Sequence, residues 1–440
     1  MREPLSFTTS DRNKRPNRSG AATLNLVLAI AWRNLGRNRR RTSLVAGAIA
    51  FAVFLTVLFM SMQSGSYVVM TENATGFLTG HIQIQPQGYS DDPRLDVSLS
   101  DATAVTALVR NNRGVVEVAP RALSYVLASA GERSVGAQLA GVVPESELVL
   151  SSLPGFLVRG SYLTPEGESR ASDGSIGFRE EAYIGQLLAR NLGLDVGDEL
   201  IILGSQKRGG IATLVVIITG IFSSGQTEVD RSLIQIPLST FQMAFDLQDE
   251  VHMLVVKTRN VNEIFQIANE LATLLPFLRV QDWPLLLPEL EQAISVDRMS
   301  GRLFYGMLLV MVIFSVVNTF IMMVFERTRE FGVLLALGMR PWPIVSLLQI
   351  EAFWLCIVGI AGGLVVAAIA VAILGDLGIP LGDNAEIMKS LHLPDRIYPA
   401  FSWEANLASP IIMLFCIQVA AFFSSIRVLK MSPVLAMRSR

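Results

Sequence analysis

The chain of 440 residues is poor in charge: Asp, Glu, Lys and Arg make up 17% of it, against 51% hydrophobic residues. Average soluble domains carry about 25% charged residues, so this composition excludes an ordinary soluble protein and indicates an integral membrane protein. The formal net charge of −2 excludes a bulk attraction to nucleic acid. We therefore expect no nucleic-acid partner.

Cysteine, histidine and catalytic signatures are also scarce. The two cysteines, Cys356 and Cys416, both lie in apolar runs, which excludes a disulfide within a soluble part of the chain. The sequence has no G-x-x-x-x-G-K-[ST] phosphate loop, no H-E-x-x-H and no C-x-x-C. The scattered histidines His81, His252 and His392 are expected to be surface or half-buried residues rather than metal ligands. We predict no catalytic, cofactor-binding or metal-binding residue here.

Long apolar runs are what the chain has in abundance. Each of four segments is long enough to cross a hydrocarbon layer of ~30 Å at ~1.5 Å per residue. Basic flanks precede the first span and follow the second and fourth, which places these flanks and both chain ends in the cytoplasm. The predicted transmembrane helices are 43–66, 300–325, 342–374 and 405–426.

The segment 67–299 has no run long enough to span, so we expect it to be a water-soluble extracytoplasmic domain. Hydrophobic patterns in it are typical of both strands and helices. The fold class predicted is therefore an α-helical membrane protein with four transmembrane helices plus a large mixed α/β extracytoplasmic domain between the first and second spans. Strands are predicted at 81–85, 213–222, 232–238 and 252–258, helices at 102–110, 181–191 and 261–275, and an extended region at 276–290.

The remaining segments connect or flank the spans. Residues 24–32 resemble the apolar part of a signal peptide, but arginines and no small-residue cleavage site follow, which favours an interfacial helix. The other expected segments are a cytosolic tail with this helix at 1–42, a cytosolic segment at 326–341, an outer loop at 375–404 and a cytosolic tail at 427–440.

The segment after the second span is amphipathic. Its first five residues, 326–330, read ERTRE, and apolar residues then recur from Phe331 to Leu337. This pattern indicates a helix at the cytosolic membrane surface with one polar face. Such a helix directly after a span is placed to pass motion between the membrane and a cytosolic partner.

The third span contains a carboxylate and a small-residue face. Glu351 lies about ten residues into the span, or ~15 Å of helix. It has two open interpretations: a proton or polar-substrate contact, or an interhelical hydrogen bond near the cytosolic interface. Gly359, Gly362 and Gly363 form a face on which another helix can approach closely.

Aromatic and methionine residues recur in the first two spans. They suit an apolar pocket for flexible acyl chains between two permeases, or they are ordinary lipid-facing and packing residues. The candidate pocket residues are Phe51, Phe54, Phe304, Met307 and Met311.

Four separated motifs carry a family resemblance: AWRNLGRNRRRT before the first span, ERTREFGVLLALGM after the second, IEAFWLCIVGIAGG in the third and RVLKMSPVLAMR after the fourth. Together they resemble the permease subunits of the MacB/LolC/LolE/FtsX type of ABC transporter. Within the predicted outer domain, GHIQIQPQGY, EAYIGQLLARNLGLDVG and GIFSSGQTEVD are most similar to the lipoprotein-releasing LolC/LolE branch.

The resemblance implies a location and partners. Such permeases lie in the bacterial inner membrane with a periplasmic domain, and two of them, identical or homologous, associate with a cytosolic ATPase dimer. ATP and Mg²⁺ are then expected on the partner ATPase and not on this chain. Membrane lipid, lipoprotein cargo and a periplasmic chaperone or adaptor are further expected partners.

The resemblance also implies a function and a coupling site. The implied function is to transmit ATPase motion to the periplasmic domain and extract lipoproteins or lipid-like cargo from the inner membrane. A MacB-like mechanical exporter with an adaptor, or an FtsX-like transducer that activates a periplasmic hydrolase, are the alternatives. The matching coupling helix comprises Glu326, Arg327, Thr328, Arg329, Glu330, Phe331, Gly332, Leu334, Leu337 and Gly338.

Overall fold

The computed structural model describes residues 39–164, 168–170, 176–178, 180–380, 396–400 and 403–426. The tail at 1–38 with its predicted interfacial helix, part of the predicted outer loop and the tail at 427–440 lie outside these residues. The chain divides into two compact units. The helical unit comprises Met1–Gln63, Met299–Leu377 and Pro399–Arg440, and the α/β unit comprises Ser64–Arg298 and Gly378–Tyr398.

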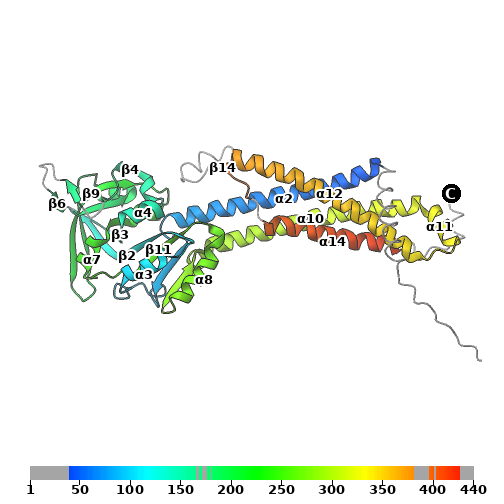
Figure 1. The fold of residues 1–440 in the computed structure, drawn as a ribbon. Helices are drawn as coiled ribbons and strands as arrows, with labels where there is room; N and C mark the ends of the chain where they lie inside the picture. The colour runs from blue at the N-terminus through cyan, green and yellow to red at the C-terminus, as the bar shows by residue number, and fades with distance from the viewer. Residues whose placement is uncertain are drawn as a thin grey trace, which may run out of the picture. The chain divides into compact units, whose positions relative to one another are not determined.

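Four long helices dominate the helical unit, where they lie side by side (Figure 1). Each is long and apolar enough to cross a membrane, which confirms the four apolar helices predicted from the sequence. The boundary between the units falls within two of them, α2 and α10. The helices are α2 (Arg39–Gly76), α10 (Pro288–Glu326), α12 (Pro341–Leu377) and α14 (Trp403–Ser425), with the short α11 (Thr328–Ala336) between α10 and α12.

The predicted extended region at 276–290 is wrong in its second half, because Trp283–Leu286 form the short helix α9 and α10 begins at Pro288. Proline suits the first turn of a helix, where its missing N–H is not needed. Glu289 and Glu291 in the same turn interact favourably with the positive end of the helix dipole.

The helical unit has its own apolar core and a close helix contact. Ile49 and Val53 of α2 pack with Val316 of α10 and Cys356 of α12 in this core. A Cβ atom on Gly363 would lie 2.5 Å from the backbone oxygen of Ala50. The backbones of α12 and α2 can therefore approach this closely only because glycine has no side chain.

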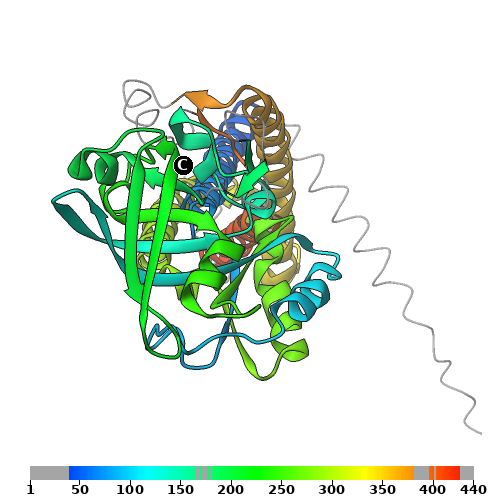
Figure 2. The same ribbon diagram turned by 90° about the vertical axis from the view of Figure 1, so that its left-hand side faces the viewer.

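Six strands of the α/β unit close into a ring. β2 (Val115–Ala130), β3 (Arg133–Val142), β10 (Leu233–Pro237), β7 (Glu181–Gly185), β9 (Ile211–Phe222) and β8 (Glu199–Ser205) pair in this order, and β8 pairs back onto β2. The long green strands in Figure 2 belong to this ring. Closure leaves no free edge among the six strands, and their apolar side chains form the largest core of the unit.

A four-stranded layer extends from the first half of β2. Its order is β12 (Leu278–Asp282), β1 (Ile82–Pro86), β11 (Met253–Thr258) and β2. Ile82 and Ile84 of β1 pack in one core with residues of α3 (Ala102–Arg110) and α8 (Ile264–Leu274). The alternating IQIQ sequence thus places isoleucines toward these helices and glutamines on the opposite face.

Shorter elements complete the α/β unit. They are α4 (Pro144–Leu150), α5 (Gln186–Leu192), α6 (Thr227–Ser232), α7 (Leu238–Phe245), α9 (Trp283–Leu286), the 3-10 turns η1 (Leu153–Phe156) and η3 (Val261–Glu263), and the strands β4 (Leu157–Gly160), β5 (Glu168–Arg170), β6 (Ile176–Phe178), β13 (Ile379–Pro380) and β14 (Arg396–Ile397).

The predicted helix at 181–191 is wrong in its first half. Residues 181–185 form β7, whose five residues are all buried between β10 and β9. A short, fully buried strand shows no alternation of polar and apolar residues, so periodicity does not separate it from a buried helix.

The glycine contacts predict a position-specific effect in α12. Gly363→Ala should destabilise the helical unit by about 1–3 kcal/mol, because the new methyl group meets backbone that must shift. Gly362→Ala is the matched control, since its Cβ would lie 3.9 Å from the Cβ of Ala50, an ordinary contact. Thermal unfolding of the two detergent-purified variants measures the difference, and equal midpoints would contradict the close packing.

Candidate functional site

The coupling segment, residues 326–338, forms a compact corner between two long helices. α10 ends at Glu326, and Arg327 leaves helical geometry with φ −100° and ψ 10° before α11 begins. At the other end Gly338 takes φ +88°, and Met339 N–H donates to the carbonyl of Leu334 at 3.1 Å. A glycine in this left-handed conformation stops α11 and turns the chain into α12.

One face of α11 is fixed to its neighbours by apolar packing. Phe331 is fully buried and packs with Val324 of α10 and with Ile344 and Leu348 of α12. Gly332 beside it is also buried. Because side chains from three helices meet here, α11 cannot tilt on its own without opening this cluster.

Arg327 joins the same three helices by charge. Its Nη1 donates to both carboxylate oxygens of Glu351 in α12, at 3.1 and 3.3 Å, and its Nε donates to Glu330 of α11 at 3.0 Å. The guanidinium also lies 5.4 Å from the centre of the Phe331 ring, within cation–π range. Glu351 is only 5% exposed. The carboxylate noted in the sequence is therefore the buried half of an ion pair between helices.

The opposite face of the coupling segment is open. Arg329, Glu330 and Val333 are exposed, and Leu337 at the end of α11 is 79% exposed. Of the ten residues proposed for coupling, Glu326, Arg329, Glu330, Leu337 and Gly338 are exposed, Arg327, Thr328 and Leu334 are half-buried, and Phe331 and Gly332 are buried. The segment thus has an inner face that supports it and an outer face that another protein can reach.

The candidate acyl-chain residues do not form one cluster within the chain. Phe304 of α10 contacts Phe59 of α2, with ring centres 5.1 Å apart. Phe51, Met307 and Met311 are exposed, and Phe54 is half-buried with its ring centre 6.5 Å from that of Phe51. A pocket between two permeases would need such exposed side chains, and so would ordinary contact with lipid.

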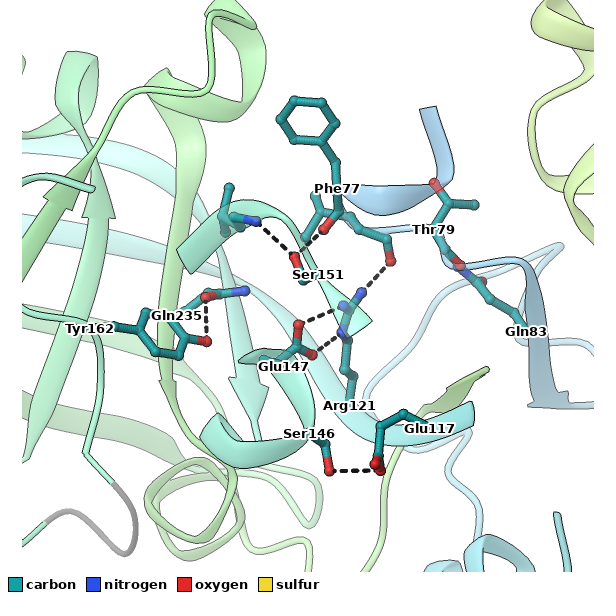
Figure 3. A network of polar contacts seen from close by, with 12 residues as sticks. Phe77, Thr79, Gln83, Glu117, Arg121, Ser146, Glu147, Ser151, Tyr162 and Gln235 are labelled. Atoms are coloured by element: carbon teal, nitrogen blue, oxygen red, sulfur yellow. Dashed lines mark hydrogen bonds and ion pairs between the residues drawn. The ribbon is translucent and has the colours of Figure 1, made fainter. Parts of the chain in front are cut away.

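The end of α2 is held by a polar network that the sequence did not reveal (Figure 3). Ser151 Oγ donates to the carbonyl of Phe77 at 2.7 Å, and Ser152 N–H donates to that of Gly76 at 2.7 Å. Arg121 donates to the carbonyl of Leu78. These bonds satisfy the carbonyl of Gly76, the last residue of α2, and the carbonyls of the two residues that follow it, where no further helical turn can donate to them. We name this network the α2 clasp.

A buried ion pair forms the centre of the α2 clasp. Arg121 of β2 donates from Nε and Nη2 to the two oxygens of Glu147 in α4, at 2.5 and 2.8 Å. The arginine side chain is 2% exposed and the glutamate side chain 0%. Two parallel hydrogen bonds fix the guanidinium plane, so its third contact is aimed at the end of α2.

Two histidines expected at the surface or half-buried are buried instead. His81 Nδ1 accepts the N–H of Thr258 at 3.1 Å, and His252 Nδ1 accepts that of Leu123 at 2.9 Å. Burial lowers both pKa values, that of His81 to about 4, with a smaller contribution from the charge of Lys257. Both rings are therefore neutral at pH 7 and serve as hydrogen-bond acceptors for backbone. His392 lies outside the described residues.

The Arg327–Glu351 pair predicts an asymmetric mutational response. Arg327→Met should destabilise the helical unit by about 3–5 kcal/mol, since it removes the guanidinium that pairs with a buried carboxylate. Arg327→Met combined with Glu351→Met should recover most of this loss. Chemical unfolding of the detergent-purified variants measures the cycle. Glu330→Gln, at the exposed partner of Arg327, should cost less than about 1 kcal/mol, and a cost equal to that of Arg327→Met would contradict the assignment.

The buried His81 predicts loss of stability in mild acid. Its pKa falls from the ordinary 6.5 to about 4 on folding, so the neutral ring contributes stability above pH 6.5 that is lost as the pH falls toward 4. Between pH 6.5 and 5 the α/β unit should lose about 2 kcal/mol. Urea midpoints from pulse proteolysis of the full chain measure this. His81→Asn should flatten the pH dependence, and an unchanged dependence in that variant would contradict it.

Comparisons with known proteins match part of the helical unit to a protein family and most of the chain to membrane proteins. The FtsX-like permease C-terminal family matches residues 302–433. The lipoprotein-releasing system transmembrane protein LolC of Xylella fastidiosa strain Temecula1 is 25% identical over 355 residues, covering 77% of this chain and 80% of LolC. The pyoverdine export ATP-binding/permease protein PvdT of Pseudomonas syringae pv. tomato is 25% identical over 354 residues, covering 78% of this chain and 51% of PvdT.

Among solved structures, the periplasmic region of MacB from Actinobacillus actinomycetemcomitans aligns with a TM-score of 0.35 at 15% identity, covering 51% of this chain and 97% of that region. The family match covers the helices that form and support the coupling segment, and the similarity to LolC extends over most of the remaining chain. Residues 302–433 thus match an FtsX-like permease family, and about three quarters of the chain is similar to permeases of the LolC and PvdT kind.

Proposed function

We propose that this chain is the membrane subunit of an ATP-driven transporter that extracts lipoproteins or similar lipid-linked cargo from the bacterial inner membrane. The observation that carries the proposal is the similarity to LolC, a lipoprotein-releasing transmembrane protein, over 77% of this chain. The basic flanks of the spans support cytoplasmic chain ends and coupling segment, with the α/β unit on the periplasmic side.

The outer face of α11 is the proposed docking site for a cytosolic ATPase. Arg329 and Glu330 supply charge, and Val333 and Leu337 supply exposed apolar surface beside it. A charged rim around an apolar centre is typical of a specific protein interface. The partner ATPase would bind ATP and Mg²⁺, since this sequence has no phosphate loop.

Motion of the docked segment would pass into the long helices. The Phe331 cluster and the Arg327–Glu351 pair attach α11 to α10 and α12. α10 and α2 each carry residues of both units, and the α2 clasp attaches the end of α2 to β2 and α4. Continuous helices anchored at their ends are suited to carry a displacement from the ATPase to the α/β unit.

A second permease would complete the membrane part. Exposed Phe51, Met307 and Met311 are available to a second permease or to lipid, and flexible methionine side chains suit acyl chains of varied shape. We therefore retain the acyl-chain pocket between two permeases as part of the proposal, with a periplasmic chaperone or adaptor as the receiver of the cargo.

Export of a small molecule is the second candidate function. It is favoured by the similarity to PvdT, a pyoverdine export protein, although this chain spans about half the length of PvdT. The cargo separates the candidates: lipoproteins should copurify with a lipoprotein-releasing permease, whereas an exporter should copurify with an adaptor and without lipoproteins.

The docking face predicts a selective loss of ATPase binding. Leu337→Asp should abolish copurification of a phosphate-loop ATPase from host membranes, because a carboxylate enters the apolar centre of the proposed interface. Leu337 makes no ion pair, so this variant leaves the support of α11 intact, unlike charge reversal at Glu330. Mass spectrometry of the purified complex identifies the ATPase.

Met243→Asp is the matched control. Met243 of α7 is 80% exposed, close to the 79% of Leu337, and lies in the α/β unit. It should leave ATPase copurification unchanged. Copurification that survives Leu337→Asp and Val333→Asp, with normal unfolding midpoints, would overturn α11 as the docking site.

A further inference from the structure

A cavity of about 300 Å³ lies in the α/β unit beside the end of α2. α2 contributes Glu72 and Thr75 to its lining, and the end of β11 with the following residue contributes Lys257, Thr258 and Arg259. His81, just before β1, completes the polar lining. The cavity is within the size range of ligand sites in proteins.

The cationic groups outnumber the carboxylate in this lining. Lys257 Nζ donates to the carbonyl of Val149 at 2.8 Å, which holds the ammonium in place and leaves two of its hydrogens available. Arg259 is anchored through its backbone N–H, which donates to the carbonyl of Gly114 at 2.9 Å. Its guanidinium forms no ion pair within the described part of the chain. Glu72 on α2 is the opposing charge.

His81 adds a hydrogen-bond donor whose tautomer is fixed. Because Nδ1 accepts the N–H of Thr258 at 3.1 Å, the hydrogen of the neutral ring must sit on Nε2. Nε2 has no hydrogen-bond partner among the residues that the structure describes. The ring is 7% exposed, and it lines the cavity together with the two cations. An anion there could accept from the Nε2–H and pair with both cations.

We propose that this cavity binds a phosphate group, held by Lys257, Arg259 and the Nε2–H of His81. Arginine and lysine are the usual protein partners of phosphate oxygens. Gly80 lies directly before His81 and also lines the cavity. It takes φ +68°, and a Cβ there would lie 2.2 Å from a methyl carbon of Val255. The turn that carries His81 into the cavity therefore requires glycine.

Phosphate in this place has two sources, a soluble phosphate compound or a phospholipid headgroup. Glu72 lies six residues beyond the predicted span end at position 66, or ~9 Å along the helix. The headgroup layer extends roughly 5–8 Å from the hydrocarbon. A headgroup source rests on the proposed membrane placement of α2, whereas phosphate binding itself does not.

Titration of the full chain in neutral detergent with inorganic phosphate, at constant ionic strength, tests the site. Wild-type protein should show saturable binding, measured by calorimetry, and acetate should bind at least tenfold more weakly. Lys257→Gln and Arg259→Gln should each weaken binding at least tenfold, whereas Arg259→Lys, which keeps the charge, should stay within threefold of wild type. Arg190→Gln removes an exposed arginine of α5 outside the cavity and should change nothing.

The Glu72→Gln variant tests whether the charged residues of the cavity act on phosphate binding or only on folding. Removing the opposing carboxylate should tighten phosphate binding severalfold, a gain that loss of folding does not produce.

Native mass spectrometry then identifies the source of the phosphate. If the protein retains phosphatidylglycerol but not a phosphate-free glycolipid, and if this retention depends on Lys257, the ligand is a lipid headgroup. Binding of inorganic phosphate without such retention indicates a soluble ligand. No saturable phosphate binding, or binding unchanged in both Lys257→Gln and Arg259→Gln, overturns the proposal while leaving the transport function untouched.

Discussion

The ion pair between Arg327 and Glu351 is the constraint on which the helical unit depends. A carboxylate that is 5% exposed in an apolar helix needs a fixed positive partner. Arg327 supplies it from the point where α10 ends, while it also contacts Glu330 and the Phe331 ring of α11. Arg327 therefore joins the same three helices that pack around Phe331. The exposed face of α11 has a defined orientation because its buried face packs against α10 and α12.

The α2 clasp uses a related arrangement in the α/β unit. Arg121 pairs with Glu147 in a site that excludes water and donates to the backbone at the end of α2. In both places an arginine with several rigid donors joins elements that lie far apart in sequence. Such pairs add little net stability compared with apolar packing, but breaking one is costly, so each element has one accepted position. That property suits helices proposed to carry motion.

The sequence predicted those helices and strands whose structure follows directly from the pattern of apolar residues along the chain. The apolar runs predicted four helices, and the alternation in β1 follows the two faces of its layer. Fully buried β7 was taken for a helix because it lacks alternation, and the hairpin of β2 and β3 was missed. Arg327 and Glu351 were both singled out, yet their pairing across 24 residues required the corner at α11. Nothing in the sequence marks Arg121 and Glu147, since their burial depends on the closed ring and on α4.

Because Phe331 packs against Val324 of α10 and Arg327 pairs with Glu330 where α10 ends, α11 should move as one body with α10. Spin labels at exposed Met339, which follows α11 and is hydrogen-bonded to its Leu334, and at exposed Phe314 report the distance between the end of α11 and the middle of α10. Cys356 and Cys416 are replaced by serine. Pulsed electron paramagnetic resonance on the complex with the proposed ATPase partner measures this distance with and without a bound ATP analogue. If α11 and α10 move together, the distance should be narrow and the same in both states. A distance that shifts or broadens when nucleotide binds would contradict it, because the motion would then be lost at the corner.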